Sequence, residues 1–148
     1  MKTPYRLDSI SPRLADLFRV ACDEQRRQAV LAACLAAIES VGLHGFEIDT
    51  AIEFIRHGCG SLENVKHNLE VLSLNFDEQY LQLNDKAGKV TPEAYLLFRQ
   101  SRVLAALAFA LSPDSGQLHE AIYEAIIAAG NRAAVLNSTE RVFMASSK

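Results

Sequence analysis

One stretch of the chain, residues 91 to 111, constrains the fold more than any other. Thr91 can cap a helix, and Pro92 suits the first helical position because an N–H group there would have no partner. Pro113 disfavours helical conformation at the residue before it and so ends the helix. The second half of the stretch is apolar on every side, which is typical of a helix surrounded by other helices. We therefore predict a central buried helix over residues 92 to 111.

Composition is consistent with one globular domain. The chain has 148 residues, 49% of them hydrophobic and 22% charged, enough for a single hydrophobic core. We expect residues 1 to 10 to form a flexible lead-in and residues 11 to 148 to form an all-α domain, a bundle of about six helices. The longest apolar runs, residues 29 to 38 and 103 to 111, reach about half the length of a membrane helix.

The chain ends and the cysteines indicate the compartment. No apolar stretch follows the N-terminus, so we expect no secretory signal. An odd number of widely spaced cysteines does not suggest a disulfide framework. We expect reduced thiols in a cytoplasmic protein, namely Cys22, Cys34 and Cys59.

The first helical region leaves two interpretations open. Ser11 and Pro12 can start a helix, and apolar residues then recur at helical spacing. The apolar stripe changes phase near Asp23, so residues 11 to 41 are either two helices or one long kinked helix. Gly42 is expected to end this region.

Two further helices are expected in the middle of the chain. Asp49 or Thr50 can cap a short helix that Gly58 closes, and Ser61 can cap the next one. Four apolar residues follow Ser61 at strict helical spacing, which predicts one buried side for this helix. They are Leu62, Val65, Leu69 and Leu72.

The two remaining regions are less sharply patterned. Residues 77 to 83 form a short helix followed by a loop, or else residues 80 to 83 and 89 to 90 flank a turn as a small hairpin. After Pro113, a helix is expected to start at residues 114 to 116 and to be capped by Gly130 and Asn131. The tail, residues 133 to 144, has enough apolar residues to dock as one or two last turns.

Acidic residues are concentrated in the middle of the chain. Residues 39 to 85 hold nine acidic residues and two basic ones, a formal charge of −7, whereas the whole chain carries −3 and its remainder therefore +4. A local excess of carboxylates attracts basic partners and speeds their association. The same carboxylates can equally serve only to hydrate exposed helix faces, and the sequence leaves both interpretations open.

A metal site is not expected. His57 and Cys59 make one closely spaced pair of possible ligands, but zinc sites usually have a second pair. Glu63 and His67 lie four residues apart, a spacing that suits a surface ion pair on a helix as well as it suits chelation. We therefore expect neither a metal nor a cofactor.

Catalytic and nucleic-acid sites are also not expected. Cys59 lies between two glycines, but no pattern for an oxyanion hole accompanies it, and no glycine-rich phosphate loop is present. A possible acid–base cluster on one helix is more typical of a hydrated face with a half-buried tyrosine, and a possible basic cluster is diluted by acids. The first comprises His119, Glu120, Tyr123 and Glu124, and the second Arg13, Arg19, Arg26 and Arg27. We expect that the protein is not an enzyme.

Two parts of the chain resemble a known family. The first is residues 90 to 95 (VTPEAY) with residues 98 to 107 (FRQSRVLAAL), and the second is residues 118 to 125 (LHEAIYEA). They look like the helical immunity proteins that bacteria encode beside polymorphic or contact-dependent toxins. This resemblance implies a non-catalytic inhibitor that occludes a toxin domain, often a basic nuclease. It implies no particular contact residues.

The resemblance and the charge pattern lead to one hypothesis, an immunity protein that neutralises a cognate basic toxin through an acidic face. Carboxylates steer the association and a few apolar or aromatic residues supply most of the affinity. One alternative is a self-associating helical adaptor or structural protein with residues 29 to 38 buried in a homodimer, and another is a helical regulator associated with nucleic acid. No membrane partner is expected. The partner contacts are expected from Glu47, Asp49, Glu53, Glu63, Glu70, Asp77 and Glu78.

Overall fold

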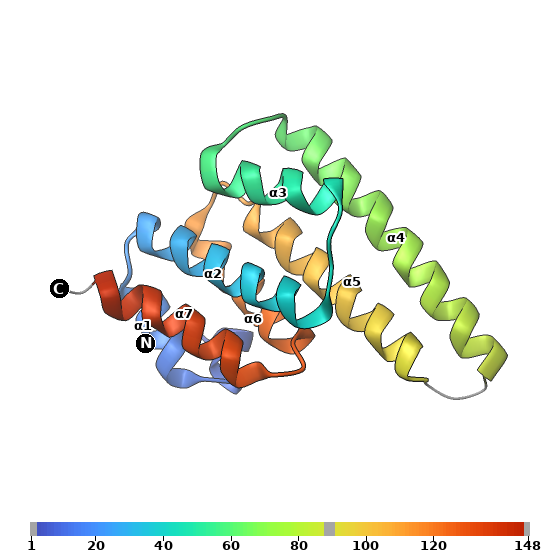
Figure 1. The fold of residues 1–148 in the computed structure, drawn as a ribbon. Helices are drawn as coiled ribbons and strands as arrows, with labels where there is room; N and C mark the ends of the chain where they lie inside the picture. The colour runs from blue at the N-terminus through green and yellow to red at the C-terminus, as the bar shows by residue number, and fades with distance from the viewer. Residues whose placement is uncertain (1–2, 88–90, 147–148) are drawn as a thin grey trace.

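The chain folds into an all-α bundle, as the sequence predicts (Figure 1). The structure is a computed structural model that describes residues 3 to 87 and 91 to 146. Over these residues there are seven α helices, two short 3-10 helices and no strand. In chain order the elements are η1 (Arg6–Ser9), α1 (Pro12–Val20), α2 (Asp23–Val41), α3 (Phe46–His57), α4 (Leu62–Ala87), α5 (Pro92–Ala110), η2 (Ser115–Gln117), α6 (His119–Ala128) and α7 (Arg132–Ser146).

The predicted central helix is α5. The hydroxyl of Thr91 accepts a hydrogen bond from the Ala94 N–H at 3.1 Å, and Pro92 occupies the first turn. Most of the second half of α5 is buried, with Val103 and Leu107 fully enclosed, although Phe109 is exposed. Helices α2, α3, α4 and α6 all pack against α5, so its apolar second half is covered on several sides.

Residues 11 to 41 form two helices, not one kinked helix. Ser11 caps α1 by accepting a hydrogen bond from the Leu14 N–H at 3.1 Å. The Arg26 side chain of α2 donates to the carbonyl oxygens of Phe18 and Arg19 at 3.0 and 3.1 Å. These bonds satisfy carbonyl groups at the end of α1, where the helix cannot supply a partner.

Helix α3 starts earlier than the sequence predicts. It begins at Phe46, directly after Gly45, so Asp49 and Thr50 lie inside the helix and the prediction that one of them caps it is wrong. Gly45 adopts a φ of 139°, which a side-chain-bearing residue rarely tolerates. Gly58 adopts a φ of 67° and ends α3 as predicted.

Helix α4 is one continuous helix of 26 residues. Residues 80 to 83 are helical, so the hairpin alternative is wrong for the described residues, and residues 88 to 90 lie outside them. The 3–4 spacing of the predicted seam continues through Leu72, Phe76, Tyr80 and Leu83, and no glycine or proline interrupts it. This longer seam packs α4 along α5, and the far half of α4 and the start of α5 project beyond the other helices (Figure 1).

The C-terminal third contains two helices. Asp114 caps η2 through the Gly116 N–H at 2.9 Å, and α6 follows directly. Gly130 and Asn131 do not cap α6, which ends at Ala128; instead the Asn131 side chain accepts from the Ala134 N–H at 3.2 Å at the start of α7. The tail is a 15-residue helix that packs against α2, longer than the one or two turns expected.

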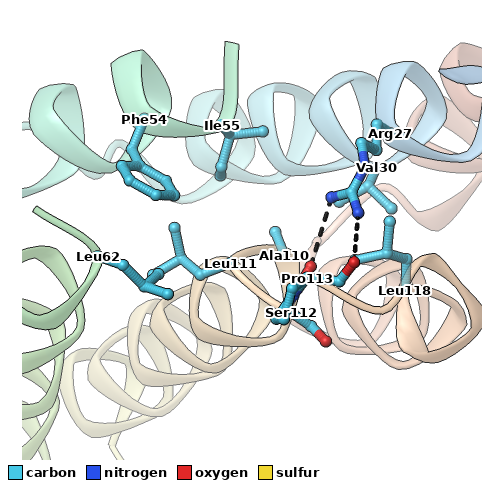
Figure 2. Close-up of a pocket in the computed structure, with 10 residues that line it drawn as sticks. All are labelled: Arg27, Val30, Phe54, Ile55, Leu62, Ala110, Leu111, Ser112, Pro113 and Leu118. Atoms are coloured by element: carbon cyan, nitrogen blue, oxygen red, sulfur yellow. Dashed lines mark hydrogen bonds between the residues drawn. The ribbon is translucent and has the colours of Figure 1, made fainter. Parts of the chain in front are cut away.

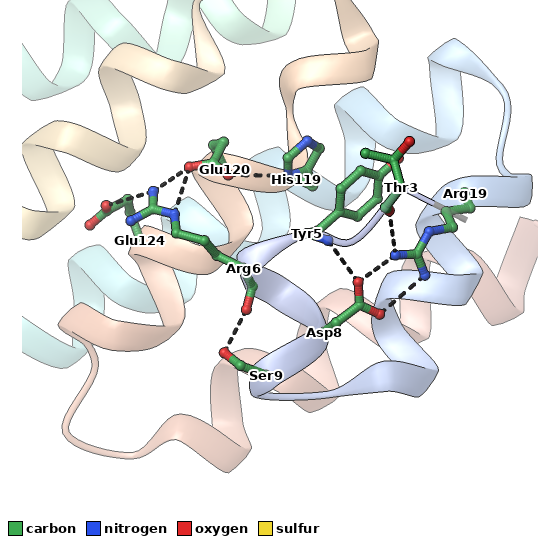
Figure 3. Close-up of polar contacts among 9 residues, drawn as sticks. All are labelled: Thr3, Tyr5, Arg6, Asp8, Ser9, Arg19, His119, Glu120 and Glu124. Atoms are coloured by element: carbon green, nitrogen blue, oxygen red, sulfur yellow. Dashed lines mark hydrogen bonds and ion pairs between the residues drawn. The ribbon is translucent and has the colours of Figure 1, made fainter. Parts of the chain in front are cut away.

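Residues 3 to 10 do not form a loose lead-in. Leu7 is 0% exposed and belongs to the hydrophobic core. The Tyr5 ring stacks on the His119 ring of α6 with centroids 3.7 Å apart, and it meets the Phe18 ring of α1 edge to face. The segment therefore joins α1 to α6 (Figure 3). Within residues 3 to 87 and 91 to 146, no helix is both long and apolar enough to cross a membrane.

Candidate protein-binding surface

The three predicted contact residues of α3 lie on two sides of that helix. Asp49 and Glu53 are four residues apart and share one side, since residues at this spacing face the same way. Both line a groove between α2 and α3 that also contains Ile38 and Ile52. Glu47 lines a different hollow, against the flank of α4.

The predicted contact residues of α4 are better aligned. Glu63, Glu70 and Asp77 follow one another at intervals of seven residues, which places them in one stripe along the helix. Glu78 is exposed beside this stripe. The Asp77 carboxylate accepts a hydrogen bond from the Ser101 hydroxyl of α5 at 2.8 Å. The seven predicted residues thus do not line a single groove.

Several carboxylates of α3 and α4 have no cationic partner among the described residues. Among the described residues, Asp49, Glu63, Glu70 and Glu78 form no ion pair, and Glu53 approaches only the His57 ring, at 4.0 Å. Carboxylates without a neutralising neighbour leave a negative potential at the surface.

The acids next to the N-terminal segment are, in contrast, neutralised. Arg6 donates to Glu120, with Nε at 2.9 Å, and to Glu124 at 3.2 Å. Arg102 of α5 reaches the other oxygen of Glu124 at 3.4 Å. These hydrogen bonds, that to Glu120 above all, raise the pKa of the Arg6 guanidinium. The acids next to the N-terminal segment are therefore neutralised, whereas several acids of α3 and α4 are not.

Exposed apolar side chains gather on α4 and α5, and the sequence analysis did not predict them as contacts. Leu74 and Leu81 of α4 are 67% and 58% exposed, and Phe98 and Phe109 of α5 are 42% and 38% exposed. Leu74 and Leu81 are seven residues apart, a spacing that could have revealed a second apolar stripe opposite the buried seam. Exposed apolar residues clustered beside polar ones are typical of interaction sites.

One of these residues, Leu74, borders a hollow between the two helices. It has a volume of about 380 Å³ and is open to solvent, and its α4 wall includes Glu70 and Leu74. Its α5 wall includes Ala105 and Ala108, whose short side chains leave the space empty. We call this surface the α4–α5 face, and it comprises Glu70, Leu74, Asp77 and Leu81 of α4 with Phe98, Ala105, Ala108 and Phe109 of α5.

The possible acid–base cluster on α6 is a buried structural network (Figure 3). Glu124 is only 4% exposed, and the Arg6 guanidinium lies over the Tyr123 ring, 4.3 Å from its centroid. The expected hydrated face is therefore wrong for His119 and Glu124, because Arg6 and the residues around it cover them. Carboxylates that are covered in this way and already bonded to arginine are poorly placed to contact a substrate.

His119 is enclosed by rings and cations. Its ring lies between Tyr5 and Phe18, and its Nδ1 atom approaches Glu120 at 3.4 Å. Burial lowers the pKa of His119, because the charged imidazolium loses hydration; the nearby carboxylate of Glu120 opposes this, whereas Arg19, Arg26 and Arg6 add to it.

The N-terminal segment is also held by a second group of polar contacts (Figure 3). Asp8 accepts from the Arg19 guanidinium and from the backbone N–H of Tyr5, the latter at 2.8 Å. Arg19 also donates to Asp16 at 2.8 Å and to the Thr3 carbonyl at 3.1 Å. The hydrogen bond to Asp8, above all, raises the pKa of Arg19.

A more enclosed cavity lies between α2, α3 and the end of α5 (Figure 2). Its volume is about 160 Å³, and most of its wall is apolar, including Val30, Phe54 and Leu111. Arg27 is its one charged residue, and its guanidinium is already bonded to the carbonyl oxygens of Ser112 and Pro113. No histidine or carboxylate lines it, so this cavity offers no acid or base for catalysis.

The other sites considered from the sequence also lack support. Among the described residues, no group of three or more histidine, cysteine or acidic side chains is placed to hold a metal ion. Cys59 is exposed, and its thiol contacts only the carbonyl of His57, at 4.0 Å. Cys34 is buried, and burial raises the pKa of its thiol to about 12.

The possible basic cluster is mostly engaged in structural contacts. Arg19, Arg26 and Arg27 donate to the carboxylates and carbonyl groups described above, whereas Arg13 is largely exposed and lies 3.9 Å from Glu140. Residues 29 to 38, whose apolar surplus suggested a homodimer, are instead covered within one chain, because α5, α6 and α7 pack on α2.

Comparison of the chain with protein-family models, curated proteins and solved structures finds no match in any of the three.

Proposed function

We propose that this protein is a non-catalytic inhibitor that binds a basic protein, and that the partner is a cognate toxin of the kind neutralised by helical immunity proteins. One observation carries the proposal. Among the described residues, Asp49, Glu63, Glu70 and Glu78 form no ion pair, and Glu70 lies beside the exposed Leu74, whereas the buried Glu124 of α6 is neutralised by Arg6 and Arg102.

Each part of this surface has a distinct role in the proposed complex. The carboxylates accelerate encounter with a positively charged partner, an effect that salt weakens. The apolar residues of α4 and α5 lose water on contact and supply most of the affinity, since a few central residues dominate most interfaces. A nuclease domain fits the partner chemistry, because its cleft must be positive to hold a polyanion.

The first experiment is co-expression with the product of the adjacent upstream gene. We expect the chain to restore growth of cells that express this product and to elute with it as a stoichiometric complex in size exclusion. If the neighbour is not toxic and no complex forms, the proposal is wrong.

Charge reversal then tests the acidic surface. We expect Glu63→Lys with Glu78→Lys to slow association with the neighbouring product and to reduce the dependence of the association rate on salt. Glu24→Lys with Glu39→Lys, both on α2, is the matched control, because both residues are exposed, Glu24 and Glu63 both lie in the first turn of a helix, and both variants change the net charge equally. Equal association rates for the two variants would exclude steering by α4.

A further inference from the structure

We propose that the α4–α5 face binds an amphipathic helix of a partner protein, with lysine or arginine along the flanks of that helix. This inference deepens the proposed function, on which it rests for the basic nature of the partner. It adds the element that is bound and the groove that receives it.

The spacing of the apolar residues selects a helix as the occupant. Leu74 and Leu81 of α4 are seven residues apart, and so are Phe98 and Ala105 of α5. Seven residues correspond to about two helical turns, or roughly 10 Å along the axis. A third helix that lies along the groove presents its own apolar residues at this same interval, as in coiled-coil and helix-in-groove packing.

The hollow is the place for an anchoring side chain. Ala105 and Ala108 of α5 leave a space of about 380 Å³, and Leu74 of α4 and Leu104 of α5 also line it. A leucine or aromatic side chain of the partner fills such a space without any movement of α4 or α5. The two helices also pack on each other along their length, which makes the groove a preformed one.

The charges on the rim select a basic occupant. Glu70 lines the hollow on the α4 side, and Asp77 follows it seven residues further along the same stripe, where it accepts a hydrogen bond from Ser101 of α5. On the α5 side, the Arg102 cation is engaged by Glu124 at 3.4 Å and lies 5.8 Å from the Phe98 ring centroid. A second copy of this chain that docked with the same face would bring like charges together, which disfavours it.

The test uses the full chain and a defined peptide. The probe is a fluorescein-labelled synthetic helix of about 21 residues, or roughly 30 Å, with leucine at heptad positions a and d and lysine at the flanking positions. We expect saturable one-to-one binding by fluorescence anisotropy. A peptide of the same pattern with glutamate in place of lysine, and another with alanine in place of leucine, should not bind.

Two variants locate the binding site. Ala105→Trp fills the hollow and should weaken binding of the lysine peptide by roughly tenfold or more. Ala133→Trp, on the exposed start of α7, is the matched control and should bind as the unmodified chain does. Circular dichroism of both variants checks that the fold is retained.

Several results would overturn the inference. The first is equal binding of the lysine peptide by the two tryptophan variants. The second is equal binding of the alanine peptide, because this would mean attraction by charge alone. The third is a dimer seen by light scattering that is lost in Ala105→Trp, because a second copy of the chain would then be the occupant. Its failure is separable from that of the proposed function. If Ala105→Trp still rescues cells from the neighbouring toxin, only the binding of a helix in the groove is wrong. If the peptide binds in the groove but the chain rescues no cells, only the toxin partner is wrong.

Discussion

Leu7 offers the sharpest test of the fold, because the sequence places it in a loose lead-in and the structure places it in the core. Leu7→Ala removes three buried carbon atoms from a side chain that is 0% exposed. At about 0.8 kcal/mol for each buried methylene, the lost transfer free energy is about 2.4 kcal/mol. The cavity that remains adds to this cost, and buried leucine-to-alanine changes cost about 2–5 kcal/mol.

The position of Leu7 near the chain end limits this cost. Residues 3 to 10 can detach locally from α1 and α6, so the loss cannot exceed the free energy that holds this segment in place. We therefore expect the free energy of unfolding to fall by about 2–3 kcal/mol. The melting temperature should fall by about 4–12 °C, from roughly 2–4 °C for each kcal/mol in a chain of this size.

Urea denaturation followed by circular dichroism measures the effect. Val20→Ala is the control, because Val20 is 85% exposed at the end of α1 and its truncation should change stability by less than about 0.5 kcal/mol. If Leu7→Ala is as stable as Val20→Ala, residues 3 to 10 are not part of the core and the docking of this segment is refuted.

Two further predictions concern titratable groups. Because burial lowers the pKa of His119, the unfolded chain takes up a proton more readily than the native one, so stability should fall as the pH drops below about 6.5, the ordinary histidine value. His119→Phe should lose this part of the pH dependence in urea titrations at pH 8 and pH 5.5, and an unchanged slope would contradict the burial argument. Cys22 and Cys59 are exposed and should react with a thiol reagent in the native state. Cys34, whose pKa is about 12, should react only on unfolding, and equal rates for the three thiols would show that its site opens readily.

Local signals in the sequence determined most of the helices. The caps at Thr91, Ser11 and Gly58 act through hydrogen bonds and backbone conformation within a few residues, so they can be read without knowing the fold. The apolar second half of α5 likewise required burial wherever its neighbours lie. The all-α fold and its central helix followed from these features.

The sequence predicted helix boundaries wrongly where another residue or a contact with another helix outweighed the local signal. Asp49 can cap a helix, but Gly45 reaches the required backbone conformation earlier, so α3 begins before Asp49. The weak pattern after Leu72 hid a seam that α5 stabilises over the full length of α4. In such cases packing against another helix decides the boundary.

Only the tertiary structure decided which polar residues are free. Glu124 and Glu70 are both helical glutamates in the sequence, yet Arg6, more than a hundred residues away, neutralises the first, and no cation of the described chain reaches the second. The α4–α5 face arises in the same way, because two helices must lie side by side before Leu74 and Ala105 can border one hollow. Periodicity reports which side of a helix is apolar, whereas the partner of that side depends on contacts between distant segments.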